Sequence, residues 1–266
     1  MKRHTTKWKP LIPFLFVAAG FLLSQTAAKA QDNNAITVYQ YRHVPSDKID
    51  EFIKRETTYW TKVAEKAVQN KTMSFWALFE KVGGYDLPNS SNFLFINTFP
   101  DIDRVGEVFA NADKTAGVKM EQMETESMST TTSMFFLNGR GWAQVNNANP
   151  PQDFNYVVMV YHDTGNPDSL INLENKYWQP FVTDAMNNKK TSLKAWGNAA
   201  VLSPSGPDIK FTTVSYDIYK TLKDALMPHW DASLTFPQEG LTQIGNLERG
   251  PRASVVYRVV KVVSAN

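Results

Sequence analysis

Two stretches of this sequence repeat one another at a nearly constant distance, and the repeat constrains the fold more than any other feature does. The pentapeptide Glu56–Trp60 returns 118 residues later as Glu174–Trp178, with its glutamate, tyrosine and tryptophan unchanged. Trp76 returns as Trp196, 120 residues later. A shift that drifts by only two residues over such a length indicates an internal repeat. We therefore expect two copies of one structural module.

Each copy shows the same order of patterns, namely strand, helix, strand, strand, helix, strand. Alternating β-branched and aromatic residues predict first strands at 36–44 and 154–162. Apolar stripes of helical period follow, starting near Ser46 and Asn166. Further strands are expected at 72–80, 93–99 and 131–138 and at 192–202, 210–216 and 253–263, with short helices near 101–112 and 219–227. Residues 113–130 are expected to be only a helix tail and a loop.

The order βαββαβ is that of the ferredoxin-like unit, whose sheet has helices on one face only. Two such units can bury their bare faces against each other. The chain resembles the dimeric α+β barrel superfamily, which includes NIPSNAP-type, EthD-type and antibiotic-biosynthesis-monooxygenase-type proteins. The opening Tyr41-Arg42-His43-Val44-Pro45, followed by a helix with Phe52, is similar to the NIPSNAP type. The resemblance implies an α+β fold, with two tandem ferredoxin-like βαββαβ modules forming an intramolecular α/β barrel. No catalytic motif of a member family matches residue by residue, so the resemblance implies no site residue.

The first thirty residues have the pattern of a secretory signal peptide. A basic start precedes the apolar run Leu11–Leu23, and the segment ends in Ala28-Lys29-Ala30. The apolar run is shorter than the roughly 20 residues that a membrane-spanning helix needs. We expect a periplasmic or secreted protein, with a signal peptide at 1–30, a first module at 31–145, a polar linker at 146–152 and a second module at 153–266.

Composition excludes several classes of function. Without residues 1–30, 23 Lys and Arg face 26 Asp and Glu, so the formal net charge becomes −3 instead of +2. Nothing basic then remains to favour nucleic acid or anionic lipid. The absence of cysteine removes disulfides, thiolate nucleophiles and thiolate metal sites. We expect no metal, no cofactor, no nucleic acid and no membrane partner after signal removal, in a monomer or a dimer, although the resembled superfamily also contains haem proteins.

Alternation along the strands predicts which side chains line the barrel interior. Aromatic rings share one face with hydroxyl, amide and imidazole groups, and this mixture favours a partly wet pocket for a small apolar or aromatic ligand. Leu94 and Ile96 are then expected to pack under the helices, although an error of one residue in register would exchange the two faces. The candidate ligand-binding residues are Tyr39, Tyr41, Trp76, Phe95, Asn97, Trp196, Thr213 and Ser215.

Two histidines are candidate catalytic residues. The repeat aligns His43 with His162 near the ends of the two first strands. Imidazole titrates near neutral pH, so either could act as an acid or a base. The alternative is that both are hydrogen-bonded residues at strand ends, without a chemical role.

Two glutamates lie inside apolar helical stripes. Glu56 falls between Phe52 and Tyr59, and Glu174 falls between Ile171 and Tyr177. A carboxyl group at such a position must be hydrogen-bonded or keep its proton. It could be a general base with a raised pKa, or it could form a structural bond where helix and sheet meet.

Three functions stay open from the sequence. The first is an exported protein that binds a small molecule in its barrel. The second is a cofactor-independent oxygenase or isomerase in which His43 or His162 is the base, and Tyr39, Tyr41 or Asn97 orients the substrate. The third is a structural or interaction protein whose barrel is filled by Trp76, Trp196, Phe95 and Phe211. No Gly-x-Ser-x-Gly turn or ordered Ser/His/Asp set indicates a serine hydrolase.

Overall fold

The computed structural model describes residues 34–82, 90–206 and 209–264. The expected signal peptide at 1–30 lies outside these residues and stays a prediction. Within the described ranges, no helix is long and apolar enough to cross a membrane.

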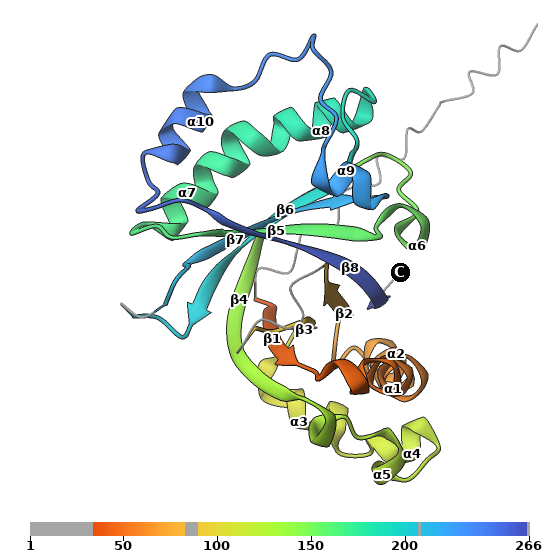
Figure 1. Ribbon diagram of the computed structural model, residues 1–266. Helices are drawn as coiled ribbons and strands as arrows, with labels where there is room; N and C mark the ends of the chain where they lie inside the picture. Colours follow the sequence, from red (N-terminus) through yellow and green to blue (C-terminus); the bar gives the residue numbers. More distant parts are fainter. Residues whose placement is uncertain (1–33, 83–89, 207–208, 265–266) are drawn as a thin grey trace, which may run out of the picture. The chain divides into compact units, whose positions relative to one another are not determined.

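A closed barrel of antiparallel strands forms the centre of the fold (Figure 1). The α+β barrel that the sequence predicts is therefore confirmed. Around the barrel the strands follow the order β1-β3-β2-β8-β5-β7-β6-β4. The strands are β1 (Ile36–His43), β2 (Phe75–Lys81), β3 (Phe93–Phe99), β4 (Thr130–Gln144), β5 (Tyr156–His162), β6 (Leu193–Ser203), β7 (Thr213–Tyr219) and β8 (Ala253–Ser264).

Strands of the same half of the chain lie together in the barrel. The first half contributes the run β4-β1-β3-β2, and the second half contributes β8-β5-β7-β6, which is the same relative order. The halves meet where β2 pairs with β8 and where β4 pairs with β6. Among the strands that the structure describes, these two pairings leave no sheet edge open, so closure removes the unpaired backbone groups that edge strands expose.

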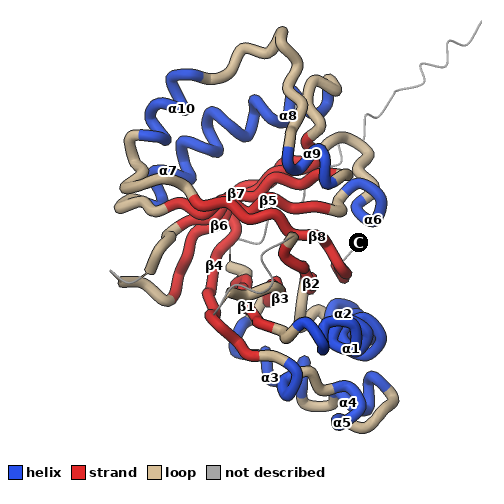
Figure 2. Tube along the Cα trace, in the orientation of Figure 1, coloured by secondary structure: helices blue, strands red, loops and turns tan. Residues whose placement is uncertain are grey.

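Helices cover the outside of the strands (Figure 2). Two helical runs are long, and each is interrupted by one π-helical turn, η2 in the first run and η5 in the second. The first run is η1 (Ser46–Lys48), α1 (Ile49–Arg55), η2 (Glu56–Trp60) and α2 (Thr61–Gln69), and the second is α7 (Pro167–Leu173), η5 (Glu174–Trp178) and α8 (Gln179–Asn187). The remaining elements are η3 (Ile102–Arg104), α3 (Val105–Phe109), α4 (Ala112–Ala116), α5 (Met120–Met123), η4 (Glu126–Met128), α6 (Pro150–Asp153), α9 (Leu222–Leu226) and α10 (Gln238–Gly245).

Two segments are more ordered than the sequence pattern predicts. The segment 113–130, expected to be a helix tail and a loop, overlaps α4 and contains α5 and η4. The predicted linker 146–152 overlaps the short helix α6, which begins at Pro150. Proline suits the first turn of a helix because its missing N–H would have no partner there.

The barrel interior is a core of aliphatic and aromatic side chains. Its buried members come from all eight strands and from no helix, as expected for the inner face of a closed sheet. Tyr41 donates a hydrogen bond to the hydroxyl of Tyr161, 3.0 Å away, so one tyrosine from each half meets inside the barrel. The buried interior residues are Tyr39, Tyr41, Ala77, Phe79, Leu94, Ile96, Phe135, Leu137, Val157, Met159, Ala195, Ala199, Val214, Ile218 and Tyr257.

Two further cores lie between the sheet and the helices. In the first half, Trp76, Phe93 and Phe95 pack with Phe52 of α1 and Val63 of α2. In the second half, Trp196 and Tyr219 pack with Val182 and Met186 of α8. The molecule therefore has one core inside the barrel and one under the helices of each half.

The predicted placement inside the barrel is correct for Tyr39 and Tyr41 and wrong for several other candidates. Trp76, Phe95 and Trp196 lie against helices. Asn97 shares their side, because it stands opposite Val38 and Trp76 in the sheet. Leu94 and Ile96, expected under the helices, line the interior instead. The physical reason is that successive residues of a strand face opposite sides, so an error of one residue inverted β2, β3, β5, β6 and β7. His162, Thr213 and Ser215, predicted inside the barrel, therefore also lie on the helix-facing side.

Candidate functional site

The π-helical turns aim one glutamate in each half at the sheet. Both begin at the repeated glutamate, Glu56 in η2 and Glu174 in η5, and both glutamates are buried. Their predicted position inside the apolar stripe is therefore confirmed. A π-helical turn is rare and often marks a functional site, so the side chains on the sheet beneath these two turns are candidates for a chemical role.

Beneath η5, a histidine joins a serine to a carboxylate. The Nε2 atom of His162 lies 2.8 Å from Ser215 Oγ, and its Nδ1 atom lies 2.7 Å from Glu248 Oε1. His162 and Ser215 come from β5 and β7, and Glu248 follows α10, bridging back to Thr164 just after β5. The imidazole is only 1% exposed. The segment after α10 thus brings a carboxylate to the end of β5.

Hydrogen bonding determines the protonation of this imidazole. Glu248 Oε1 also accepts a hydrogen bond from Arg252 Nε at 2.8 Å, so this oxygen is an acceptor and His162 Nδ1 is the donor. Burial lowers the pKa of His162, although the bond to Glu248 opposes this effect. In the neutral imidazole, Nε2 then accepts a hydrogen bond from the Ser215 hydroxyl. Since both nitrogens have partners, this histidine does not fit the role of an axial haem ligand.

A second carboxyl group lies on the other side of the imidazole. Glu174 Oε1 is 3.8 Å from His162 Nε2, and Glu174 Oε2 accepts a hydrogen bond from Asn198 Nδ2 at 2.9 Å. Burial raises the pKa of Glu174 to about 7, against the smaller lowering effect of the bond from Asn198. Near neutral pH, part of the population therefore carries a carboxylic acid here, which can donate a hydrogen bond.

Three buried polar atoms of this cluster have no hydrogen-bond partner among the described residues. They are Asn198 Oδ1, Thr213 Oγ1 and Glu248 Oε2. Asn198 stands opposite Ser215 in the sheet, and Thr213 stands opposite His162. Buried polar atoms without partners cost about 1–3 kcal/mol each. The cluster can therefore gain free energy by binding a group that hydrogen-bonds to these atoms.

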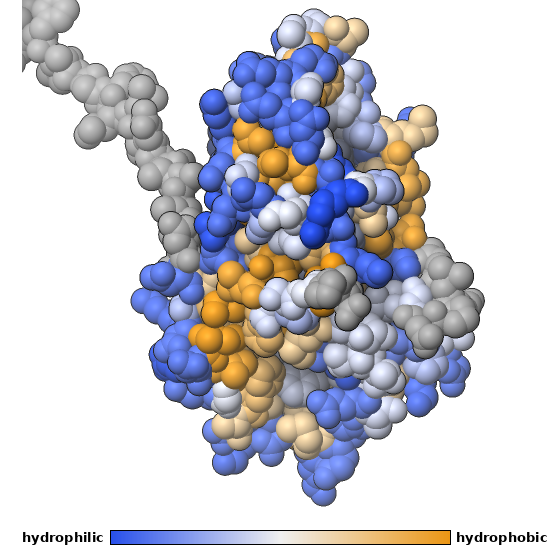
Figure 3. Space-filling model, turned by 90° about the vertical axis from the view of Figure 1, so that its left-hand side faces the viewer, coloured by the Kyte–Doolittle hydropathy of each residue, from blue (hydrophilic) through white to orange (hydrophobic). Residues whose placement is uncertain are grey.

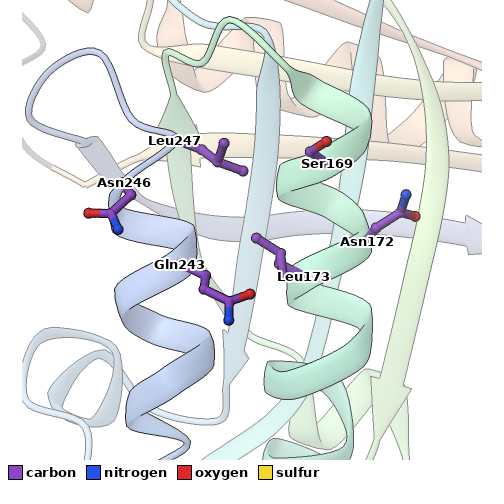
Figure 4. A pocket seen from close by; sticks show the side chains of 6 residues that line it. All are labelled: Ser169, Asn172, Leu173, Gln243, Asn246 and Leu247. Carbon is purple, nitrogen blue, oxygen red and sulfur yellow. The ribbon is translucent and has the colours of Figure 1, made fainter.

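A groove opens on the surface of the second half. It runs between α7 and α10, has a volume of about 430 Å³, and is lined by Ser169, Asn172, Leu173, Gln243, Asn246 and Leu247. Leu173 and Leu247 point into the space between the two helices (Figure 4). These leucines directly precede Glu174 and Glu248 in the chain. On the side of the molecule that carries α10, apolar side chains gather in patches framed by hydrophilic residues (Figure 3).

The corresponding positions of the first half are mostly apolar. Leu78 stands opposite Phe95 as Asn198 stands opposite Ser215. Phe93 stands opposite Arg42 as Thr213 stands opposite His162. The same framework is thus stable with leucine and two phenylalanines where the second half has an amide and two hydroxyl groups. The fold alone does not require the polar cluster.

The expected equivalence of His43 and His162 is wrong. Tyr41 and Tyr161 both stand opposite interior residues, Leu94 and Val214, so the position equivalent to His162 is occupied by Arg42. A shift of 119 residues aligned the histidines, whereas the strand registers require a shift of 120.

Arg42 and His162 occupy equivalent positions, and each lies near the glutamate of its own half. Arg42 donates a hydrogen bond to the carbonyl oxygen of Thr125 at 3.4 Å, and the Thr125 hydroxyl donates to Glu56 Oε1 at 2.6 Å. His43 instead lies at the end of β1, where Nδ1 donates to the Ser90 carbonyl oxygen at 2.7 Å.

Of the predicted site residues, the structure brings His162, Thr213 and Ser215 together. Tyr39 and Tyr41 lie in the interior core, and Trp76, Phe95, Asn97 and Trp196 lie on the helix-facing side. Sequence reasoning missed Glu248 and Asn198. Asn198 followed the repeated Trp196 by two residues and so shared its face, but no pattern in the sequence places Glu248 beside His162.

No protein-family model and no curated protein sequence matches this chain. The fold is similar to that of a candidate monooxygenase from Lactobacillus acidophilus NCFM, with a TM-score of 0.55 and 9% identity over 87% of this chain and 96% of the other. An anthrone oxidase-like protein has a TM-score of 0.54 and 14% identity, over 88% of this chain and 94% of the other. A candidate monooxygenase from Fusobacterium nucleatum has a TM-score of 0.53 and 10% identity, over 86% and 94%. At such low sequence identity, these similarities show the fold alone. The fold agrees with the resemblance to the α+β barrel superfamily.

Proposed function

We propose that this protein is an exported α+β barrel that binds a small organic molecule beneath η5, beside His162. The observation that carries the proposal is the contrast between the halves. Asn198, Thr213 and Ser215 occupy positions where the first half has Leu78, Phe93 and Phe95. Polar atoms that are buried, unpaired and not needed by the fold are best explained by a ligand that pairs with them.

We also propose that the two halves are tandem ferredoxin-like modules derived from one another. The equal strand order and the π-helical turn at each repeated glutamate support this origin. Under this proposal, one module kept apolar side chains at the positions of Leu78, Phe93 and Phe95, and the other acquired polar ones there. The signal peptide at 1–30 would deliver the protein to the periplasm or the exterior.

The ligand of this site would be small and mostly apolar, with one or two polar groups. The α7–α10 groove, about 430 Å³ in volume, offers Leu173 and Leu247 to an apolar part. Unpaired oxygens of Asn198 and Thr213 offer acceptors to hydroxyl or amine groups, and Thr213 can also donate. Most pockets for small molecules combine an apolar lining with a few placed polar groups.

Thermal unfolding and native mass spectrometry against small phenols, ketones and esters test this proposal. A ligand at 100 times its Kd would stabilise the fold by about 2.7 kcal/mol, a rise in Tm of roughly 5–10 °C. The substitution Asn198→Leu copies the residue of the first half, so it should keep the fold and abolish the rise. Tyr39→Phe, inside the barrel, should leave the rise unchanged. A rise that survives Asn198→Leu and disappears in Tyr39→Phe would place the ligand in the barrel interior instead.

A cofactor-independent oxygenase or isomerase is the second candidate function. One observation favours it, namely that burial lowers the pKa of His162, so that a neutral imidazole is available as a base. The candidate monooxygenases share the fold with this chain. In this second candidate, His162→Gln would abolish turnover of a ligand from the binding screen while leaving the unfolding transition in place.

A further inference from the structure

The atoms around His162 have the arrangement of an activated nucleophile. Ser215 Oγ lies 2.8 Å from Nε2, and Glu248 Oε1 lies 2.7 Å from Nδ1, so the imidazole bridges a hydroxyl and a carboxylate. The bond to Glu248 fixes the tautomer in which Nε2 is free to accept a proton. Hydroxyl, imidazole and carboxylate in this connectivity form a nucleophile, its base and the group that orients the base, and they are recognised by geometry on unrelated folds.

We propose that Ser215, His162 and Glu248 carry out acyl transfer from a small ester to water. This inference rests on the proposed binding site and names the substrate class that it takes. Sequence patterns gave no sign of it, because the three residues lie far apart in the chain and Ser215 is in the middle of a strand rather than at a sharp turn.

The reaction balances with water as the only co-reactant. Ser215 Oγ forms a bond to the carbonyl carbon of the ester while its proton passes to His162 Nε2. The bond from that carbon to the alcohol oxygen then breaks, and the departing oxygen takes the proton from Nε2. Water attacks the acyl-serine in the same way, giving the free acid and restoring the Ser215 hydroxyl. No oxidation or reduction takes place.

Two groups beside Ser215 can donate hydrogen bonds to the oxyanion that forms. Thr213 lies two residues away on the same face of β7, about 6.6 Å along the strand, and its hydroxyl has no partner among the described residues. Glu174 approaches from η5, and its Oε1 atom is 3.8 Å from His162 Nε2. In the protonated form, this carboxyl group is a donor. Thr213 and protonated Glu174 are therefore the donors that we assign to this oxyanion.

The surroundings of Ser215 favour a small acyl group. The serine is 7% exposed, so a substrate must enter between the helices and the sheet. The α7–α10 groove is the approach that we propose, because Leu173 and Leu247 line it and are adjacent in sequence to Glu174 and Glu248 (Figure 4). Ester groups with short apolar chains suit this entrance better than charged or polymeric ones.

Covalent labelling of the full-length protein tests this inference. Phenylmethylsulfonyl fluoride reacts with an activated serine, with loss of fluoride, and p-nitrophenyl acetate can leave an acetyl group that is trapped by rapid acidification. We expect one adduct in the intact mass, mapped to Ser215 by peptide sequencing. Ser215→Ala and His162→Gln should abolish the adduct, and Glu248→Gln should slow its formation at least tenfold.

The control substitution is Ser233→Ala, an exposed serine in the loop before α10, which should leave labelling unchanged. Circular dichroism verifies that each variant is folded. If neither reagent modifies Ser215 in the folded wild-type protein, while chymotrypsin in the same tube is labelled, the inference is wrong. Ligand binding that is lost in Asn198→Leu would in that case still support the proposed function, so the two failures are distinguishable.

Discussion

At the scale of single residues, buried carboxyl groups are the most distinctive feature. Glu56 and Glu174 are each held under a helix, with one hydrogen bond from Thr125 or Asn198. Burial raises the pKa of both to about 7. The sequence predicted this situation from the place of each glutamate in an apolar stripe. It could not predict the partners, because Thr125 and Asn198 come from elements remote in the chain.

These pKa values predict that Glu174→Gln stabilises the protein at alkaline pH. The folded state holds the proton up to about pH 7, whereas the unfolded chain releases it near 4.5. The stability due to the protonated form is therefore complete below pH 4.5 and is lost as the pH rises through 7. The loss amounts to at most about 3 kcal/mol, and glutamine avoids it.

Urea unfolding of the wild type and the variant at pH 5 and pH 8.5 measures this difference. Glu56→Gln is a matched variant, since its carboxyl group has the same burial and the same raised pKa. For both variants, the free energy of unfolding relative to the wild type should be higher at pH 8.5 than at pH 5. An equal difference at both pH values would contradict the raised pKa.

At the scale of elements, strand faces decide the architecture. The positions of the strands were predictable because β-branched and aromatic runs alternate with turn residues. The face of each strand that looks inward was not predictable, because Phe93 and Phe95 have the same apolar character as Leu94 and Ile96. Tyr41 was assigned correctly, whereas Trp76 and Trp196 were not. The packing of Trp76 and Trp196 against the helices resolves this choice.

A glycine on the inner face of β6 provides a test of the packed interior. A Cβ atom added at Gly197 would lie 2.6 Å from the ring and the hydroxyl group of Tyr216. Gly197→Ala should therefore destabilise the protein by about 1–3 kcal/mol, because the tyrosine must move within a packed core. Chemical unfolding measures the change.

The control is Gly106→Ala in α3, where the added Cβ atom has no heavy atom within 4 Å among the described surroundings. This variant should be as stable as the wild type, or more stable by up to about 1 kcal/mol, because alanine favours a helix. Equal behaviour of the two variants would mean that the barrel interior has room to spare at Tyr216.

At the scale of the whole molecule, the two halves share a framework and differ in what they place under the helices. Trp76 and Trp196 fill equivalent places, and a buried glutamate follows α1 as another follows α7. Beside them, the first half has Arg42 and Phe95 where the second half has His162 and Ser215. The repeat predicted the shared part. It could not predict the difference, since a shift of 119 rather than 120 residues aligned the wrong histidine.

The state of the His162 ring tests the central claim most directly. Nitrogen-15 NMR of the imidazoles between pH 6 and pH 8, with His162→Gln to assign the signals, reads which ring nitrogen holds the proton. The structure predicts a proton on Nδ1, held by Glu248, and an Nε2 that becomes protonated only below the ordinary pKa of histidine. A ring that becomes doubly protonated at an ordinary histidine pKa, or one that holds its proton on Nε2, would contradict the account of this site.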